Sequence, residues 1–136
     1  MTDHDDRIDR TLLDRAKAAT ESSYAPYSAY RVGAALLCAD GAVFTGCNVE
    51  NANYSNSIHA EELALGKAIE AGHRSFEALA VVSDEDDGVT PCGMCRQSLS
   101  EFCEPTLRVV CESAGTIERY TLGELLPAAF GEAHLR

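Results

Sequence analysis

Four residues in two short segments could together bind a metal ion and move protons. The first segment, His59-Ala-Glu61, places an imidazole two positions before a carboxylate, and the second, Cys92-Gly-Met-Cys95, supplies two thiols. Zn²⁺ prefers nitrogen and sulfur ligands, so we predict one Zn²⁺ per chain, bound by His59, Cys92 and Cys95. Three protein ligands leave the fourth position open to water, as catalysis requires.

Glu61 suits the role of a proton carrier beside such a metal. Water bound to Zn²⁺ can lose a proton near pH 7, and a positioned carboxylate can accept that proton and return it. The combination of His-x-Glu with a later Pro-Cys-x-x-Cys resembles the signature of zinc-dependent nucleobase deaminases, in which the glutamate carries protons. This resemblance implies that Glu61 is the catalytic residue.

The cysteine pair alone is compatible with two other functions. A thioredoxin-like redox pair would leave His59 and Glu61 unexplained, and it would lie unusually late in the chain. A closed structural zinc site of an interaction module would need a fourth ligand, for which Cys47 and Cys103 are available. This second alternative stays open at the level of sequence.

The chain alternates helical and strand-like segments, and both groups of chemical residues fall where helices begin. Apolar spacing and turn signals predict helix 8–20, strands 30–38 and 43–49 joined by Asp40-Gly41, a polar loop 50–57, helix 59–71, strand 76–83, helix 92–102, strands 106–111 and 116–120, and helix 121–130. Such alternation predicts a mixed α/β domain whose sheet is covered on both faces by helices.

Helix geometry explains how the four residues could meet. Cys92 and Cys95 are about 300° apart around a helix and therefore share one face. His59 and Glu61 are about 200° apart, so they converge only if the metal lies beyond the start of their helix. The free N–H groups and the dipoles of two helix starts would also favour thiolates there.

Length and charge limit the class of protein. The 136 residues, 46% of them hydrophobic, predict one domain over residues 1–136 with a core of its own. The start is acidic and no apolar run approaches the ~20 residues of a membrane span, so we expect a cytoplasmic protein without membrane contact. A net charge of −11 disfavours a nucleic-acid partner and suggests a high-salt cytoplasm. Folding and activity that survive removal of molar salt unchanged would contradict the salt hypothesis.

The six cysteines favour burial or metal binding over disulfides, because the chain shows no secretory signal. Cys38 and Cys111 end apolar strand-like runs, and Cys103 lies on a predicted helix. We expect these three to be buried as small hydrophobic residues. The sequence leaves the role of Cys47 undecided.

Five further segments extend the resemblance along the whole chain. They begin at Tyr24, Tyr30, Gly46, Pro91 and Leu125 and read YAPYS, YRVGAALL, GCNVENANYS, PCGMCRQ and LLPAAF. In this order they are similar to segments of the small homotetrameric cytidine deaminases, so the resemblance runs from end to end. It implies a three-layer α/β/α cytidine deaminase-like fold with a mixed five-stranded sheet.

The resemblance also implies which residues bind substrate. Asn48 and Glu50 would hold the ribose hydroxyls, which suits an amide and a carboxylate because these hydroxyls donate hydrogen bonds. Tyr30 would line the nucleoside pocket where the family usually has Phe, and the backbone N–H of Ala60 would face the pyrimidine carbonyl. In a homotetramer with active sites at subunit interfaces, neighbouring subunits would complete each pocket with Ala52, Tyr54 and Phe130.

The chain departs from the family at two linked positions. Tetrameric members usually have Cys-Ala-Glu-Arg where this chain has His59-Ala-Glu-Glu62. Two thiolates and a neutral imidazole give a formally neutral Zn²⁺ site, whereas three thiolates give a charge of −1 that benefits from an Arg. We therefore predict that His59→Cys lowers activity and that adding Glu62→Arg restores part of it.

The resemblance implies a reaction as well. It is zinc-dependent hydrolytic deamination of cytidine and 2′-deoxycytidine to uridine and 2′-deoxyuridine, with release of ammonia, as in pyrimidine salvage. The expected partner is thus a small nucleoside. An alternative substrate is a related cytosine nucleoside such as blasticidin S, although Asn48, Glu50 and Phe130 favour cytidine.

Overall fold

A mixed five-stranded sheet with the order β2-β1-β3-β4-β5 runs through the middle of the protein. The computed structural model describes residues 3–135, with side chains from residue 5 onward. The parallel pair is β3 with β4, and the other neighbours are antiparallel. The strands are β1 (Val32–Cys38), β2 (Val43–Cys47), β3 (Phe76–Ser83), β4 (Arg108–Ser113) and β5 (Thr116–Thr121).

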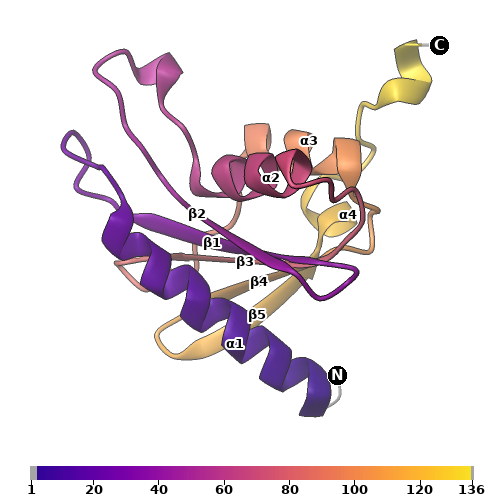
Figure 1. Cartoon of the computed structure of the whole chain (residues 1–136), viewed down its shortest axis with the longest axis horizontal. Coiled ribbons are helices and arrows are strands. Elements are labelled where there is room, and N and C mark those ends of the chain that lie inside the picture. The colour runs from indigo at the N-terminus through magenta and orange to yellow at the C-terminus, as the bar shows by residue number, and fades with distance from the viewer. Residues whose placement is uncertain (1–2, 136) are drawn as a thin grey trace.

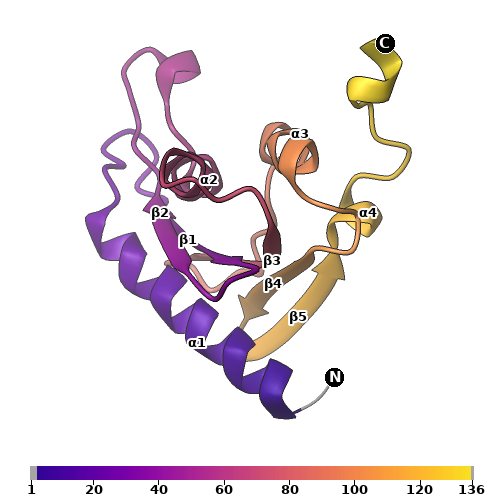
Figure 2. The ribbon, with the colours of Figure 1, turned by 45° about the vertical axis from the view of Figure 1, so that its right-hand side comes forward.

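Helices cover both faces of this sheet, as Figures 1 and 2 show. The long helix α1 (Asp3–Ala19) lies across one face. Helices α2 (Ala60–Glu70) and α3 (Gly93–Phe102) lie side by side on the other, with the short α4 (Leu122–Leu125) near the end of β5. The prediction of a three-layer α/β/α fold with a mixed five-stranded sheet is confirmed.

The central strands are buried on both faces, and their alternating side chains separate into two cores. Leu36 and Leu79 face the α2 and α3 side, whereas Ala35 and Ala80 face α1. Runs of small and branched apolar residues therefore form strands that can be covered by helices on each side.

Two glycines allow the helices to come close to the sheet. A Cβ atom at Gly33 would lie 1.9 Å from the carbonyl oxygen of Ala16 in α1, and one at Gly46 would lie 2.2 Å from that of Ala60 in α2. Both positions therefore require glycine for close packing. Gly46 affects the candidate metal site, because it determines how closely the start of α2, next to His59, approaches the sheet.

Two sequence predictions about packing and length are wrong in part. The helix predicted over 121–130 ends at Leu125, because Pro127 disfavours helical backbone at Leu126 before it. After a non-helical segment the chain makes only a single 3₁₀ turn, Glu132–Leu135. Cys103 is partly rather than fully buried, whereas Cys38 and Cys111 are buried as predicted and Cys47 is buried too.

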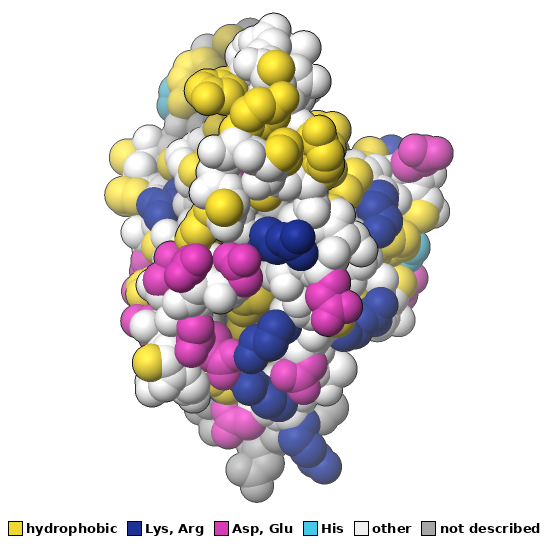
Figure 3. All heavy atoms as spheres, turned by 90° about the vertical axis from the view of Figure 1, so that its left-hand side faces the viewer, with side chains coloured by type: hydrophobic (Ala, Val, Ile, Leu, Met, Phe, Trp, Pro, Cys, Tyr) yellow, Lys and Arg dark blue, Asp and Glu magenta, His cyan; other side chains and the backbone are white. Residues whose placement is uncertain are grey.

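One face of the protein is divided by polarity. On the face in Figure 3, hydrophobic side chains gather at the upper end, while acidic and basic side chains are mixed over the lower part around α1. The exposed aromatic residues include Tyr24, Tyr27 and Tyr54. Within residues 3–135, no helix combines the length and apolar character needed to cross a membrane.

Candidate metal and substrate site

The chemical residues meet where two helices begin. His59 is the N-cap of α2 and Cys92 is the N-cap of α3, both with extended backbone, as the sequence predicts. Cys95 lies one turn into α3, and α2 packs beside α3. The two helix N-termini therefore converge on one point, where their dipoles favour anionic ligands.

Three of these side chains form a compact group of metal-ligand type. The His59 Nδ1 atom lies 3.2 Å from the Cys92 Sγ and 3.4 Å from the Cys95 Sγ. Neighbouring ligands of a tetrahedral Zn²⁺ with nitrogen and sulfur donors are separated by about 3.5 Å. Donor chemistry and spacing thus both fit Zn²⁺.

Burial and the nearby Glu61 carboxylate raise the pKa of the Cys95 thiol well above its ordinary value. This thiol is therefore protonated when no cation is bound. Because Zn²⁺ binds thiolates, its binding would release a proton from Cys95. Metal affinity at this site should accordingly increase with pH.

The geometry gives no support to a closed structural zinc site. Neither Cys47 nor Cys103 belongs to the group whose ligand atoms lie within 4.8 Å of one another. Cys103 follows the last residue of α3, about 15 Å along the helix axis from Cys92. The three-membered group therefore keeps one side free, and that side faces the pocket.

A second group of ligand-type residues, Cys38, Asp40 and His73, lies at the β1–β2 turn. Its His73 Nε2 is 3.0 Å from the Asp40 carboxylate, which also accepts the backbone N–H of Ala42 at 3.0 Å. These contacts pin the hairpin turn to the segment that follows α2. We interpret the group as a structural contact, because His73 and Ala42 both bond the Asp40 carboxylate within the turn region.

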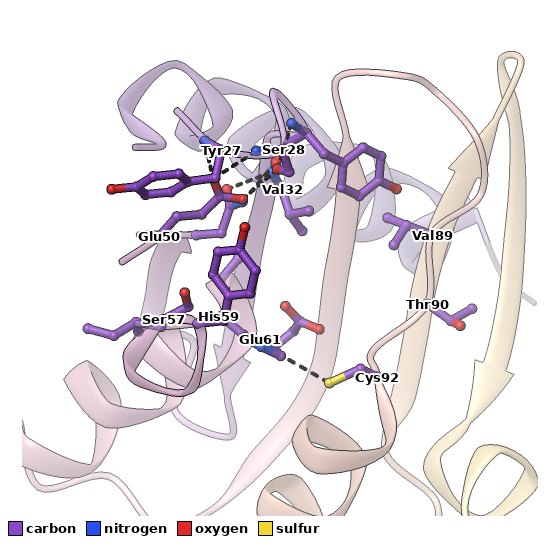
Figure 4. A pocket seen from close by; sticks show the side chains of 15 residues that line it. Tyr27, Ser28, Val32, Glu50, Ser57, His59, Glu61, Val89, Thr90 and Cys92 are labelled. Carbon is purple, nitrogen blue, oxygen red and sulfur yellow. Dashed lines mark hydrogen bonds between the residues drawn. The ribbon is translucent and has the colours of Figure 1, made fainter. Parts of the chain in front are cut away.

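A pocket of about 490 Å³ opens beside the His59 group (Figure 4). Its volume falls in the range that small-molecule sites occupy. Glu50, Tyr27 and Ser28 lie at one end in Figure 4, and His59 with Glu61 and Cys92 at the other. The residues that line it are Tyr27, Ser28, Tyr30, Val32, Asn48, Glu50, Tyr54, Ser57, Ile58, His59, Ala60, Glu61, Val89, Thr90 and Cys92.

Glu61 is a buried carboxylate at the metal end of the pocket. Its side chain is 6% exposed, and burial raises the pKa of the carboxyl above its ordinary value. Within the described residues, no ion pair joins Glu61 to a Lys or Arg. A carboxyl with a raised pKa exchanges protons more readily near neutral pH, so the environment suits the predicted role.

Ala60 is the first residue of α2 and is fully buried against the pocket. The first N–H groups of a helix have no partner within the helix. A donor is therefore available beside Glu61, where the family resemblance places a donor to the pyrimidine carbonyl.

Glu50 is held rigidly at the far end of the pocket. One oxygen accepts the backbone N–H groups of Tyr27 at 2.9 Å and Ser28 at 3.1 Å, and the other accepts the Ser28 hydroxyl. The Ser28 hydroxyl and these N–H groups lower the pKa of Glu50, so it stays ionised. It therefore presents a fixed acceptor to a ligand.

The Asn48 side chain bonds the backbone of the pocket wall. Its Nδ2 donates to the Tyr30 carbonyl at 2.8 Å, and its Oδ1 accepts the Val32 N–H at 2.9 Å. One N–H and one lone pair stay available to a ligand. The amide thus fixes the start of β1 while lining the pocket.

The three residues assigned to neighbouring subunits occupy different places in the chain. Tyr54, 75% exposed, lines the pocket of its own chain and packs edge-on against Tyr27 with ring centroids 6.2 Å apart. Ala52 is exposed on the same loop but does not line this pocket. Phe130 lies on the C-terminal segment, 56% exposed and stacked on His134.

Glu62 has a structural contact that the sequence analysis did not predict. Its carboxylate accepts the backbone N–H of His59 at 3.0 Å. This contact is half of a capping box, and it fixes the main chain of the candidate ligand. Glu62 therefore acts directly on the main chain of His59.

Several residues of the pocket lacked a predicted role. The Tyr24–Ser28 segment carried a family resemblance but no signal that Tyr27 and Ser28 would hold Glu50. Val89 and Thr90 lie in an acidic loop with no local motif.

Arg96 lies next to Cys95 and also had no predicted role. It donates to the carbonyl oxygens of Pro91 at 2.6 Å and Leu125 at 2.8 Å, which ties the segment before Cys92 to α4.

Fold and site together define an α/β/α protein in which one His and two Cys of metal-ligand type meet at two helix starts beside a pocket. Residues 6–112 match the family model described as the cytidine and deoxycytidylate deaminase zinc-binding region. A cytidine deaminase of Sporosarcina psychrophila is 47% identical over 125 residues, which cover 91% of this chain and 92% of that protein.

Solved structures lead to the same family. A cytidine deaminase from Burkholderia pseudomallei is 47% identical, with a TM-score of 0.85 over 96% of this chain and 100% of that one. The enzyme from Mycobacterium tuberculosis is 38% identical, with a TM-score of 0.80 over 90% and 96%. The chain therefore belongs to the cytidine deaminase family, a family of hydrolases.

Proposed function

We propose that this protein catalyses the hydrolytic deamination of cytidine and 2′-deoxycytidine to uridine and 2′-deoxyuridine, releasing ammonia in pyrimidine salvage. The main support is the position of Glu61, buried in the pocket beside the His59, Cys92 and Cys95 group. We further propose that residues 1–136 form one cytoplasmic catalytic domain, with no nucleic-acid or membrane partner.

His59, Cys92 and Cys95 would hold one Zn²⁺ per subunit. Their donor types and their separations of 3.2 and 3.4 Å support this assignment. When bound, Zn²⁺ supplies a nucleophile at neutral pH by lowering the pKa of water to about 7.

Glu61 moves the protons of the reaction. It accepts a proton from the attacking water and delivers it to N3 of cytosine as the oxygen adds to C4. It then takes the remaining proton of the new C4 hydroxyl and passes it to the amine, which leaves as ammonia while the C4 carbonyl forms. The backbone N–H of Ala60 donates to the pyrimidine carbonyl and so orients the ring. The buried position of Glu61 keeps bulk water from competing for these protons.

Glu50 and Asn48 bind the ribose at the opposite end of the pocket. Glu50 accepts hydrogen bonds from the sugar hydroxyls, and its ionised carboxylate repels a 5′-phosphate. Asn48 contributes its remaining N–H while it holds the Tyr30 backbone. The pocket therefore selects nucleosides over nucleotides.

The active protein is a homotetramer in which Ala52, Tyr54 and Phe130 complete the pockets of neighbouring subunits. The exposure of Tyr54 and Phe130 supports this proposal, since large aromatic side chains favour burial. Gln97, two residues after Cys95, donates to the Phe130 carbonyl at 2.9 Å and so connects this segment with the ligand helix. Tyr54 would be shared by two pockets, since it also lines its own.

A single substrate panel tests the proposal. Purified protein with quantified zinc is assayed for ammonia release from cytidine, 2′-deoxycytidine, cytidine 5′-monophosphate and blasticidin S. We expect turnover of the first two, and none of the monophosphate. Preference for blasticidin S would assign the alternative substrate, and no turnover of any compound by zinc-loaded protein would contradict the proposal.

A further inference from the structure

Tyr30, which lines the pocket, is held through every polar group it has. Its N–H donates to the Ser28 hydroxyl at 3.0 Å, and its carbonyl accepts from Asn48 at 2.8 Å. Its phenol donates to an oxygen of Asp87 at 2.7 Å. The first two partners belong to the pocket, but Asp87 lies outside the residues that line it.

Asp87 belongs to the loop that leads from β3 to the Cys92 segment. Its second oxygen accepts the Ser83 hydroxyl at 2.8 Å, and its backbone forms a bridge with Ser113 at the end of β4. Next to it, the Gly88 N–H donates to the Glu112 carbonyl at 3.1 Å. Asp87 is thus anchored to the sheet independently of Tyr30.

The Tyr30–Asp87 hydrogen bond joins the two walls of the pocket. Residues 27–32 form one wall, and Val89 and Thr90, which follow Asp87, form part of the other. In Figure 4 these two residues lie across from Glu50 and Ser57. The bond therefore links the two walls of the pocket through residues that are 57 positions apart in the chain.

The two groups have the protonation states that this link requires. Burial raises the pKa of Tyr30, which keeps the phenol a donor. Burial opposes ionisation of Asp87, but hydrogen bonds from Tyr30 and Ser83 outweigh it and lower the pKa of its carboxyl. A neutral donor therefore faces a charged acceptor, an arrangement that gives stronger hydrogen bonds than two neutral groups.

We propose that Asp87 is a positioning residue that fixes the Tyr30 side chain on the pocket wall and thereby increases affinity for the nucleoside. The inference rests on the proposed function. Asp87 acts through Tyr30 and is not part of the metal-ligand group, so its loss should affect binding more than the chemical step. Without the link, substrate binding must also order the Tyr30 ring, which costs affinity.

A double-mutant cycle with cytidine tests this proposal. Tyr30→Phe and Asp87→Ala each remove one partner, and we expect each to raise KM about 3–10-fold while kcat changes by less than about twofold. The double variant should be no worse than either single one, because both remove the same bond. Asp87→Asn keeps an acceptor for the phenol and should restore most of the affinity.

Controls separate positioning from a structural role. Glu85→Ala removes another exposed acidic side chain from the same loop and should leave KM unchanged. Zinc content and melting temperature are measured for every variant. A joint loss of kcat and zinc in Asp87→Ala would assign a structural role and overturn the proposal.

Three other results are decisive. Unchanged KM in Tyr30→Phe, or strictly additive effects in the double variant, would overturn this inference while leaving the proposed function intact. Absence of cytidine turnover by the zinc-loaded wild-type protein would overturn the proposed function and this inference together. The first two results leave wild-type turnover in place, so failure of this inference and failure of the proposed function are distinguishable.

Discussion

Two buried carboxylates lie on opposite faces of the same sheet, and their surroundings differ. Asp9 in α1 is 0% exposed and accepts hydrogen bonds from Arg108 at 2.9 Å and Arg119 at 2.8 Å. Glu61 in α2 is 6% exposed and has no such ion pair among the described residues. Burial is therefore similar, but only Asp9 is paired with cations.

The difference separates a structural acid from a candidate catalytic one. A buried carboxylate destabilises the fold unless cations or hydrogen bonds compensate it, and two guanidinium groups do this for Asp9. Glu61 instead borders a pocket and has a raised pKa, both of which accompany function. Burial alone therefore does not distinguish the two acids, whereas a position at the pocket without a Lys or Arg partner in the described part of the chain makes Glu61 the candidate for catalysis.

Replacement of Glu61 should give the largest effect. Glu61→Gln preserves size and hydrogen bonding but cannot carry protons, so we expect kcat to fall about 10³-fold or more. Zinc content should stay near one per chain, and stability should not fall. Steady-state kinetics with metal analysis measures this, and a variant with the wild-type rate would remove Glu61 from the mechanism.

The paired acid should show the opposite behaviour. Asp9→Asn leaves Arg108 without its carboxylate partner and leaves Arg119 with Asp6 alone, so we expect a loss of about 3 kcal/mol in the free energy of unfolding. Activity per folded molecule should stay unchanged. Urea unfolding measures the loss, with the exposed Asp14→Ala as the matched control for α1; a fall in kcat at full folding would break the distinction between the two faces.

Gly33 and Gly46 allow the same comparison between the two faces of the sheet, with smaller expected effects. Gly33→Ala forces α1 away from the sheet and Gly46→Ala forces α2 away, so each should lose about 2 kcal/mol of stability. Because α2 begins at the candidate ligand, only Gly46→Ala should also weaken zinc binding. Thermal unfolding measures the stability of the two variants, and chelator competition measures their zinc affinity. Equal zinc affinity in both variants would show that the distance of α2 from the sheet does not affect metal binding.

Substitutions at His59 and Glu62 should have the smallest effects. His59→Cys should lower activity about tenfold, because the added thiolate leaves an uncompensated negative charge. Adding Glu62→Arg should restore part of it by charge balance, but it removes the cap on the residue 59 N–H and should cost about 1 kcal/mol of stability.

Glu62→Gln is the control for that pair, since it keeps an acceptor for the N–H while removing the charge. It should leave stability near that of the wild type. Kinetics and calorimetry are measured on the wild type, His59→Cys, His59→Cys with Glu62→Arg, and Glu62→Gln. If Glu62→Arg restores no activity, the charge-balance account of this unusual ligand pair is wrong.

Local sequence signals predicted most elements but failed where several influences compete. Pro91 and the Ala- and Glu-rich run after His59 correctly indicated two helix starts. Apolar spacing predicts that the final helix continues to residue 130, but α4 ends at Leu125 because Pro127 disfavours helical backbone at the residue before it. The predicted burial of Cys103 is wrong in part, because this residue is the C-cap of α3 and is only partly covered.

The pocket was predictable only in part. Its charged and metal-binding residues have recognisable types and spacing, and the family resemblance pointed to Tyr30, Asn48 and Glu50. Hydrogen bonds between distant segments have no local pattern, so the contacts of Glu50 with Ser28 and of Tyr30 with Asp87 could not be read from the chain.

The sequence by itself determined the candidate ligands, the proton carrier and the helix starts that present them, because these depend on residue type and on spacing within one turn. Only the tertiary structure decided that His59 meets a cysteine pair 33 residues away, and that Tyr30 meets Asp87. The physical reason is strand register: pairing of Val32 with Ser83 brings the end of β3 beside the start of β1. Burial of both sheet faces then holds the helices, and the site between them, in place.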